Sequence, residues 1–188
     1  TGDDGTTGMA DGSRVSKAEN LFSVMGDIDE LNSHIGLIRA QLAQTSTDAN
    51  KEADFAQALV IIQHLLFNIG GELAMPEYEG VSAAHIDWLE QQIDAMNSTL
   101  PALKDFILPT GSVLVSQLHV ARTVCRRAER QAVLLQQQRP EAIRPTAVSF
   151  INRLSDWLFV AARFCTDPEE VSEVLWDSQL LQKFAENK

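Results

Sequence analysis

The first 17 residues carry small, hydroxylated and charged side chains that could hold a phosphate group. The run begins Thr1-Gly2-Asp3-Asp4-Gly5-Thr6-Thr7-Gly8 and continues through Gly12 to Lys17. Glycines at positions 2, 5, 8 and 12 would allow positive φ, which turns successive backbone N–H groups toward one anion. Threonine hydroxyls and the Lys17 ammonium would add further donors. An ordinary polar loop is the alternative, because the same residue types also make turns.

A second group of chemically capable residues lies in the segment Ala121-Arg122-Thr123-Val124-Cys125-Arg126-Arg127-Ala128-Glu129-Arg130. On a helix, Arg122, Arg126 and Glu129 fall within about 60° of each other, and Arg130 lies at the edge of that face. A solvated helix more usually interleaves opposite charges at i and i+4, so this face predicts a polyanion site. The alternative is a surface face that pairs with acidic residues of a neighbouring helix or subunit.

Two further segments carry polar residues among apolar ones. Asn152 and Asp156 share a helical face at i and i+4 in Ile151-Asn152-Arg153-Leu154-Ser155-Asp156. An amide in such surroundings is either a satisfied core group or a ligand contact. Asp29, in Asp29-Glu30-Leu31-Asn32, lies in the middle of another helical pattern, where solvated acidic residues are the ordinary case.

These residues must be positioned by helices, because apolar side chains recur at steps of three and four along most of the chain. The predicted stripes run from Leu21 to Leu42, from Phe55 to Leu73, from Ile86 to Met96, from Leu114 to Leu135 and from Phe150 to Phe164. Ser82 and Ser112 are expected N-caps, and prolines at 76, 101 and 140 are expected to separate helices. No convincing strand alternation is present. The pattern predicts an all-α antiparallel five-helix bundle.

Length and composition predict a single domain over residues 1–188, with a loop at 1–17 and a helical bundle and C-terminal tail over 18–188. The chain is 45% hydrophobic and 22% charged, enough to bury one sizeable core. With no apolar run of about 18 residues and no charged-then-apolar leader, we expect a cytoplasmic protein, or an organelle-matrix protein if a targeting segment was removed. The net charge of −11 argues against a nucleic-acid partner. Cys125 and Cys165 are expected to be core thiols.

Taken together, these segments resemble the PduO-type ATP:corrinoid adenosyltransferases, also called cob(I)alamin adenosyltransferases. The loop is similar to the family's T-G-D-x-G-T-T and R-V-x-K motif, and residues 26–32 (GDIDELN) resemble its G-x-x-D-E-L-N segment. Further matches follow in the expected order at residues 106–109 (FILP), 119–130 (HVARTVCRRAER) and 152–156 (NRLSD). The resemblance covers nearly the whole chain.

The resemblance implies a homotrimer that binds ATP and a corrinoid between adjacent subunits and transfers the 5′-deoxyadenosyl group of ATP to cobalt, releasing triphosphate. Mg²⁺ is expected on the ATP phosphates, with no direct protein ligand assigned. The implied ATP-binding residues are Thr1, Gly2, Asp3, Asp4, Thr6, Thr7, Lys17, Arg126, Glu129, Arg130 and Asn152. Asp29 and Arg122 are implied to pair across the subunit interface and to serve catalysis. Phe106 is implied to serve catalysis by lying against the corrin.

The resemblance also implies binding partners, and the same bundle could serve other functions. ATP and a reduced corrinoid are the expected ligands, a cobalamin reductase and an adenosylcobalamin-dependent enzyme are further candidate partners, and no membrane partner is expected. A non-catalytic ATP- or corrinoid-binding carrier or sensor could use the same bundle. A di-iron bundle and a Walker-type ATPase are disfavoured, because the sequence has neither a Glu-x-x-His pair nor a G-x-x-x-x-G-K-[ST] segment. His119 is expected to be a structural residue rather than a cobalt ligand.

Overall fold

The computed structural model describes residues 2–10, 12–45, 49–75, 77–166, 173–180, 182 and 184. Most of them belong to helices, as expected from the apolar stripes. The helices are α1 (Asn20–Thr45), α2 (Ala49–Ala74), α3 (Ala83–Asn97), α4 (Val113–Gln138) and α5 (Pro145–Phe164), with a short 3-10 helix at Pro140–Ala142. The all-α five-helix prediction is confirmed.

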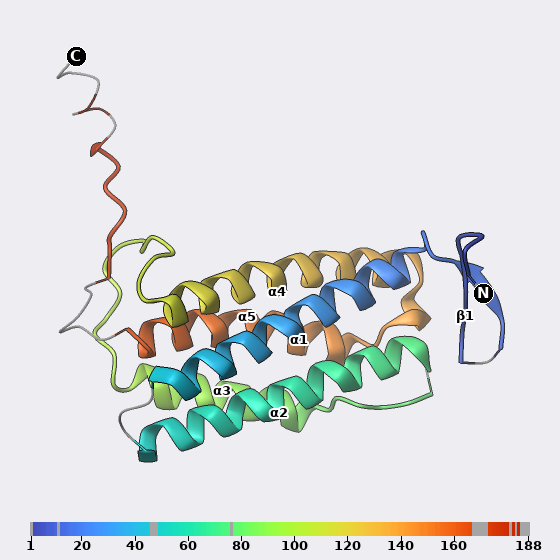
Figure 1. The fold of residues 1–188 in the computed structure, drawn as a ribbon, viewed down its shortest axis with the longest axis horizontal. Coiled ribbons are helices and arrows are strands. Elements are labelled where there is room, and N and C mark those ends of the chain that lie inside the picture. The colour runs from blue at the N-terminus through green and yellow to red at the C-terminus, as the bar shows by residue number, and fades with distance from the viewer. Residues whose placement is uncertain are drawn as a thin grey trace.

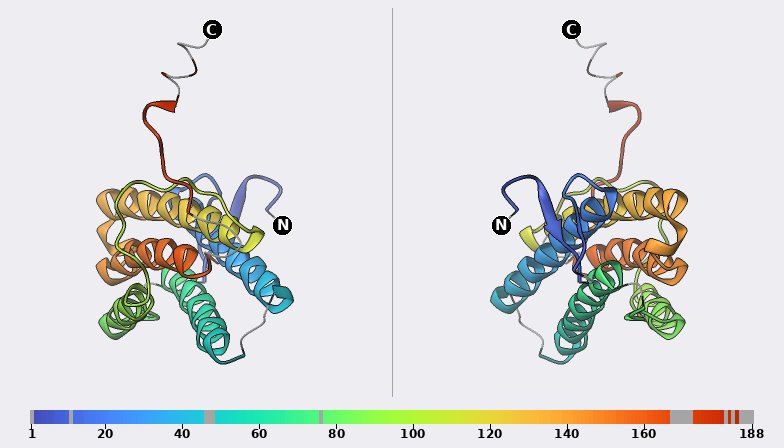
Figure 2. Two further views of the ribbon diagram at one scale, coloured as in Figure 1. Left: turned by 90° about the vertical axis from the view of Figure 1, so that its left-hand side faces the viewer. Right: turned by 90° about the vertical axis from the view of Figure 1, so that its right-hand side faces the viewer.

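The helices pack lengthwise in the order α2, α1, α4, α5, α3, so that α4 lies between α1 and α5 (Figure 1). Seen from the ends, α2 and α3 lie below the other three helices (Figure 2). Trp157 and Phe150 of α5 are fully buried in the middle of the core, and Phe55 of α2 stacks on Trp157 with ring centroids 5.5 Å apart. Burying each such side chain contributes roughly 1.5–3 kcal/mol, so α5 contributes much to the rigidity of the scaffold.

The two predicted N-caps, Ser82 and Ser112, agree with the structure, whereas Pro76 lies outside the described residues. The Ser112 hydroxyl caps α4 by accepting a hydrogen bond from the Val115 backbone N–H at 3.3 Å. Ser82 is the N-cap residue of α3, and Pro145 occupies the first position of α5, where its missing N–H costs nothing. These local signals set the residue at which each helix begins, and thereby the position of each polar side chain along it.

The N-terminal segment differs from the prediction, because it contains two short strands. β1 (Thr6–Gly8) pairs antiparallel with β2 (Arg14–Ser16), with Thr7 opposite Val15. Strands of three residues are too short to produce a readable alternation, which explains why the sequence did not reveal them. Gly2, Gly5 and Gly12 take positive φ, whereas Gly8 lies within β1 and does not.

Helix α2 includes a stretch, Ala53–Ala74, that is long and apolar enough to cross a membrane by length and composition alone. A buried core helix of a helical bundle can have the same length and apolar composition. Here Leu59, Ile62, Leu66 and Ile69 are completely buried in the core. The stretch therefore reads as a core helix, and by itself it is weak evidence for a membrane.

The two ends of the bundle carry different irregular segments. The β1–β2 hairpin lies at one end, beside the start of α1 (Figure 1). The α3–α4 loop (98–112) and residues 173–180 lie at the opposite end, where residues 173–180 project away from the helices (Figures 1 and 2). The bundle thus separates the hairpin from the α3–α4 loop, although both were predicted from the sequence to belong to one functional site.

Candidate functional site

The N-terminal loop is curled into a defined shape by its own hydrogen bonds. The Lys17 ammonium donates to the Gly2 carbonyl at 2.8 Å, and the Lys17 backbone N–H donates to the Gly5 carbonyl at 2.9 Å. The Asp4 carboxylate accepts from the backbone N–H and the hydroxyl of Thr6, at 3.0 and 2.8 Å, and these bonds lower the pKa of Asp4. The loop therefore holds the Lys17 ammonium against the Gly2 carbonyl and the Asp4 carboxylate against Thr6.

The other loop residues expected in the site have different positions. Asp3 is exposed, and Thr7 is half-buried in the hairpin opposite Val15. Thr1 lies outside the described residues. The loop thus presents both acidic and basic groups, with Arg14 of β2 3.5 Å from the Asp4 carboxylate.

Two arginines on the predicted face of α4 are exposed, as the polyanion prediction requires. Arg130 donates to the Arg126 carbonyl at 3.1 Å, one turn earlier. Within the described part of the chain, neither side chain forms an ion pair with a carboxylate. The predicted alternative, in which this face bridges to acidic residues of a neighbouring helix, is not what this chain does at these two positions.

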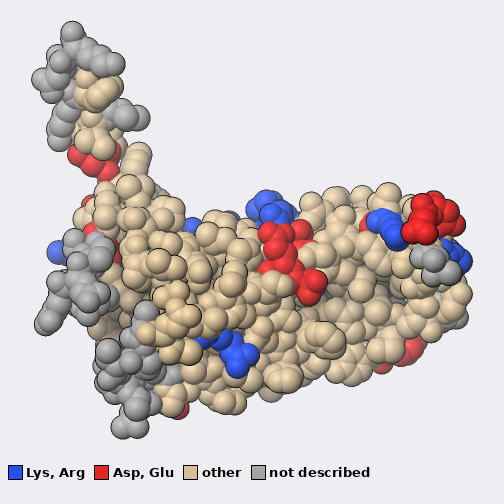
Figure 3. All heavy atoms as spheres, viewed as in Figure 1, with Lys and Arg blue, Asp and Glu red and all other residues tan. Residues whose placement is uncertain are grey.

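Arg127, between them in sequence, behaves in the opposite way. Its Nε lies 3.0 Å from the Asp27 carboxylate of α1, and its Nη2 bonds to Glu30 on the same helix. The Asp27 hydrogen bond raises the pKa of Arg127. Acidic and basic side chains adjoin midway along the bundle on the face shown in Figure 3, and again at the hairpin end, while most of the remaining surface there is uncharged. Arg127 therefore ties α4 to α1.

Arg122 is half-buried, and its Nε has no hydrogen-bond partner among the residues described. Burial and the nearby Arg126 both lower the pKa of Arg122. Asp29 is exposed on α1 and forms no ion pair with the described residues of its own chain. The predicted Asp29–Arg122 pair belongs to two subunits, so the structure of one chain leaves it a prediction.

Asn152 and Glu129 come together from neighbouring helices. The amide Nδ2 of Asn152 donates to the Glu129 carboxylate at 2.7 Å. Asn152 is exposed rather than buried, so it is not a core amide. Arg153, the next residue, lies 2.8 Å from Glu90 of α3 and 3.2 Å from Asp156, and thereby joins α5 to α3.

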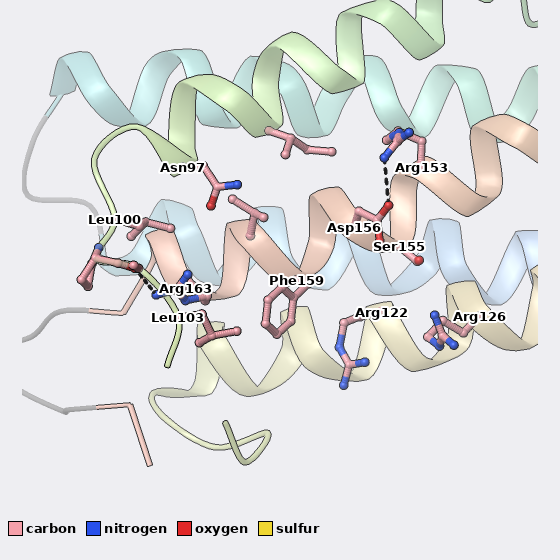
Figure 4. Close-up of a pocket in the computed structure, with 14 residues that line it drawn as sticks. Asn97, Leu100, Leu103, Arg122, Arg126, Arg153, Ser155, Asp156, Phe159 and Arg163 are labelled. Atoms are coloured by element: carbon pink, nitrogen blue, oxygen red, sulfur yellow. Dashed lines mark hydrogen bonds and ion pairs between the residues drawn. The ribbon is translucent and has the colours of Figure 1, made fainter. Parts of the chain in front are cut away.

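A cavity of about 650 Å³ lies between α3, α4 and α5. Arg122 and Arg126 border it from α4, while Asp156, Phe159 and other residues border it from α5 (Figure 4). Its full lining comprises Ile93, Asn97, Leu100, Pro101, Ala102, Leu103, Arg122, Arg126, Arg153, Ser155, Asp156, Phe159, Val160 and Arg163. Cationic groups beside an apolar wall suit a ligand with an anionic part and a large apolar part. Arg163 and Asn97 were not foreseen from the sequence.

Phe106 projects into solvent, with 78% of its surface exposed. Its ring meets that of Trp176 edge to face at 6.4 Å. The backbone N–H of Trp176 donates to the Phe106 carbonyl at 2.8 Å, and the backbone N–H of Leu108 donates to the Val174 carbonyl at 2.8 Å. The C-terminal segment is therefore paired with the loop that carries Phe106, a contact that no local sequence signal announced.

The predicted site residues consequently fall into three places in one chain. The hairpin with Lys17 is at one end, Arg126 and its neighbours are midway along α4, and the Phe106 loop is at the other end (Figure 1). One copy of the chain does not bring the hairpin and Phe106 together.

Two buried groups near the arginine face have structural surroundings. His119 is buried, and burial together with Arg122 lowers its pKa, which keeps the ring neutral at pH 7. Cys125 donates its thiol hydrogen to the Ile151 carbonyl at 3.2 Å, and burial raises its pKa. Across the ranges that the structure describes, no group of three His, Cys, Asp or Glu side chains is arranged to hold a metal ion.

Known proteins resemble this chain over almost its whole length. The profile of the family described as cobalamin adenosyltransferase matches residues 1–165. A cobalamin adenosyltransferase of Cupriavidus metallidurans is 45% identical over 95% of this chain and 92% of its own length. A corrinoid adenosyltransferase of Mycobacterium tuberculosis is 42% identical over 94% and 90% of the two chains.

A solved structure shares the fold as well as the sequence. It is a phenylalanine-to-alanine variant of a PduO-type ATP:corrinoid adenosyltransferase from Lactobacillus reuteri, complexed with cobalamin and ATP. It superposes with a TM-score of 0.81 and 35% identity, covering 95% of this chain and 97% of the other. These likenesses span the hairpin, the arginine face and the Phe106 loop together.

Proposed function

This chain belongs to the cobalamin adenosyltransferase family, and from that membership we infer that it transfers the 5′-deoxyadenosyl group of ATP to the cobalt of a reduced corrinoid. The products are adenosylcobalamin and triphosphate. ATP and cob(I)alamin are both substrates. The observation that best supports this activity is the exposed cationic face of α4, where Arg126 and Arg130 make no ion pair with described residues on an otherwise acidic chain.

We propose that the triphosphate lies between the hairpin and this face. Lys17 and the loop N–H groups would bind one side, and Arg126 and Arg130 would bind the other as forked donors suited to phosphate oxygens. The Asn152–Glu129 pair, at 2.7 Å, would border the nucleoside. Asp3, Asp4, Thr6 and Thr7 would shape the loop, with Thr1 and Gly2 at its start.

The protein contributes positioning and charge stabilisation to this reaction, because cobalt, and not a side chain, is the nucleophile. The electron pair of Co(I) forms the bond to the ribose C5′, and the pair of the breaking C5′–O bond leaves with the triphosphate. Negative charge therefore develops on the leaving oxygen, where preorganised guanidinium groups stabilise it. Mg²⁺ is expected on the phosphates. Phosphate oxygens and water are ligands that suit Mg²⁺, and no protein ligand is assigned to it.

We propose that the corrin lies against Phe106. Phe106 is 78% exposed and contacts Trp176, which is 54% exposed, and adjoining exposed aromatic side chains of this kind form an apolar patch that is typical of a binding surface. Packed beneath the corrin, the ring would keep water and other ligands off the lower face of cobalt. Loss of that ligand makes reduction to Co(I) easier, so the residue would tune the cobalt of the substrate.

The separation of the three groups in one chain supports a site shared between copies. In the proposed homotrimer the hairpin of one subunit faces the α4 arginines of the next, and Asp29 of one pairs with Arg122 of the other. That pair would supply the partner that the half-buried Arg122 Nε lacks among the described residues of its own chain. We further propose a cytoplasmic location, with a cobalamin reductase and an adenosylcobalamin-dependent enzyme as partners.

Anaerobic incubation with ATP and chemically reduced cob(I)alamin tests the function. We expect adenosylcobalamin in the cobalt spectrum and an equal amount of triphosphate, with neither product when the corrinoid is omitted. Steady phosphate release from ATP alone would contradict the proposal. A carrier or sensor would bind both ligands and release no triphosphate.

A further inference from the structure

Arg163, in the last turn of α5, is a buried cation with two partners outside its helix. Only 6% of its surface is exposed. Its Nε donates to Glu173 Oε1 at 2.6 Å, and its Nη2 lies 3.4 Å from Glu173 Oε2 and 2.9 Å from the Pro101 carbonyl. One guanidinium thus contacts both the C-terminal segment, at Glu173, and the start of the α3–α4 loop. Figure 4 shows Arg163 and its bond to the loop.

The two segments held by Arg163 meet again a few residues further on. The loop and the tail form a bridge between Ile107 and Leu175, flanked by the two backbone hydrogen bonds that join Phe106 to Trp176 and Leu108 to Val174. Glu173 is three residues from Trp176, and Pro101 is five residues from Phe106. Arg163, the tail and the loop therefore close a ring of contacts, with Phe106 and Trp176 at its outer edge.

The energetics favour a fixed arrangement at the Arg163 end. A buried guanidinium without a partner is strongly destabilising, so the contact to Glu173 is costly to open. The fork of the guanidinium engages both carboxylate oxygens and a carbonyl, which restricts direction as well as distance. By contrast, the outer end of the ring is exposed and consists of few hydrogen bonds, which alone would open easily.

We propose that Arg163 is a positioning residue for the corrinoid, acting through Glu173 and Pro101 to hold Phe106 and Trp176 in place beneath it. The inference rests on the proposed function, because it assumes that Phe106 meets the corrin. Arg163 itself does not touch the reacting atoms. Without the contacts of Arg163 to Glu173 and Pro101, Phe106 and Trp176 would move independently of the bundle. The lower face of cobalt would then be open to water for part of the time.

The test uses Glu173→Gln and Arg163→Gln in the full chain. Hydrogen exchange should quicken by about 10-fold or more at the Leu108 and Trp176 amides in both variants, because their hydrogen bonds lose the anchor. With ATP and Co(II) cobalamin bound, the four-coordinate Co(II) signal in electron paramagnetic resonance should fall by about half or more. ATP affinity should stay within about twofold, since neither Arg163 nor Glu173 is among the groups proposed to bind ATP.

Arg139→Gln is the matched control. Arg139 is also an arginine paired with carboxylates, at 3.0 Å from Glu19 and 3.4 Å from Glu141, but it lies at the other end of α4. It should leave the exchange at Leu108 and the Co(II) signal unchanged. If Arg163→Gln does not fold, Glu173→Gln tests the same bond from the tail, outside the core.

Two results would overturn the proposal. Unchanged exchange at Leu108 and Trp176 would show that Arg163 does not hold the ring closed. Faster exchange with a wild-type Co(II) signal would reduce Arg163 to a structural residue. Failure of the proposed function looks different, because then the wild-type protein would form no adenosylcobalamin from Co(I) and ATP.

Discussion

Arg126 and Arg127 are adjacent on α4 but lie in opposite circumstances. Arg127 points to α1, where Asp27 and Glu30 neutralise it. Arg126 is exposed on the next face, borders the α3–α4–α5 cavity and has no carboxylate partner in the described part of the chain. One helix therefore separates a cation that stabilises the bundle from cations left over for a ligand, and the difference comes from 100° of rotation.

The functions of arginines on one helix therefore depend on which face each of them occupies. A paired arginine contributes little to function when replaced by a residue that keeps the helix, because its charge is already neutralised. An unpaired one beside a cavity is maintained against its own desolvation and mutual repulsion, as the lowered pKa of Arg122 illustrates. Unpaired cations on an acidic protein therefore indicate where an anion binds.

The largest expected effect is at Arg126. Arg126→Lys should lower kcat/KM by about 10-fold or more, because a point charge replaces a planar fork that fits phosphate oxygens. Arg127→Lys is the matched control and should change kcat/KM by less than about threefold, since an ammonium can still pair with Asp27 and Glu30. Equal losses in the two variants would erase the distinction between the two faces.

A charge reversal at Asp29 should act on assembly. Asp29→Arg would place two like charges together in the proposed interface and raise the trimer dissociation constant by about 10-fold. The double variant Asp29→Arg/Arg122→Asp should recover part of the loss. Sedimentation velocity measures both. A fully active monomer in either case is incompatible with a shared site.

Phe106 should show a smaller and conditional effect. When Co(II) must first be reduced by an added one-electron donor, Phe106→Ala should slow adenosylation by roughly fivefold, because water returns to the cobalt; supplying cobalamin already reduced to Co(I) should restore most of the rate. ATP affinity should not change. Phe67→Ala is the control, since Phe67 is likewise 78% exposed but belongs to α2 and not to the α3–α4 loop. Loss of activity at Phe67 as well would point to a general effect of removing exposed aromatics.

The smallest effect belongs to the stability of the paired face. Arg127→Gln should lower the free energy of unfolding by less than about 1 kcal/mol, because the ion pairs with Asp27 and Glu30 are partly exposed and screened. Urea denaturation measures the change, and adenosylation should remain within about twofold of wild type. An inactive but well-folded Arg127→Gln protein would assign this residue to the site.

The sequence predicts the helices well because their signals are local. Apolar residues every three or four positions and the Ser112 cap depend on neighbours along the chain. The residue types of the site were also readable, since Lys17 and Arg126 lie in recognisable runs. The sequence did not reveal that these residues lie in three separate parts of one chain, because that separation depends on the length and direction of the helices between them.

The features that the sequence did not predict have a common physical cause, because each depends on contacts between residues far apart in the chain. The hairpin strands are three residues each, and their pairing depends on Val15 meeting Thr7 across a turn. The tail joins the Phe106 loop through backbone bonds, which any sequence can form. Arg163 lies in the apolar pattern of α5, where a charged residue that must find a partner was the one available signal.

The most direct test of the shared site is complementation between two inactive subunits. Lys17→Ala impairs the hairpin and Arg126→Lys impairs the α4 face. If each site uses the hairpin of one subunit and α4 of the next, trimers reassembled from equal amounts should recover about one quarter of wild-type activity, because one in four hairpin–helix pairings unites two intact halves. Each variant reassembled alone should stay at its own low activity. A mixture no more active than the average of its two components would contradict the account.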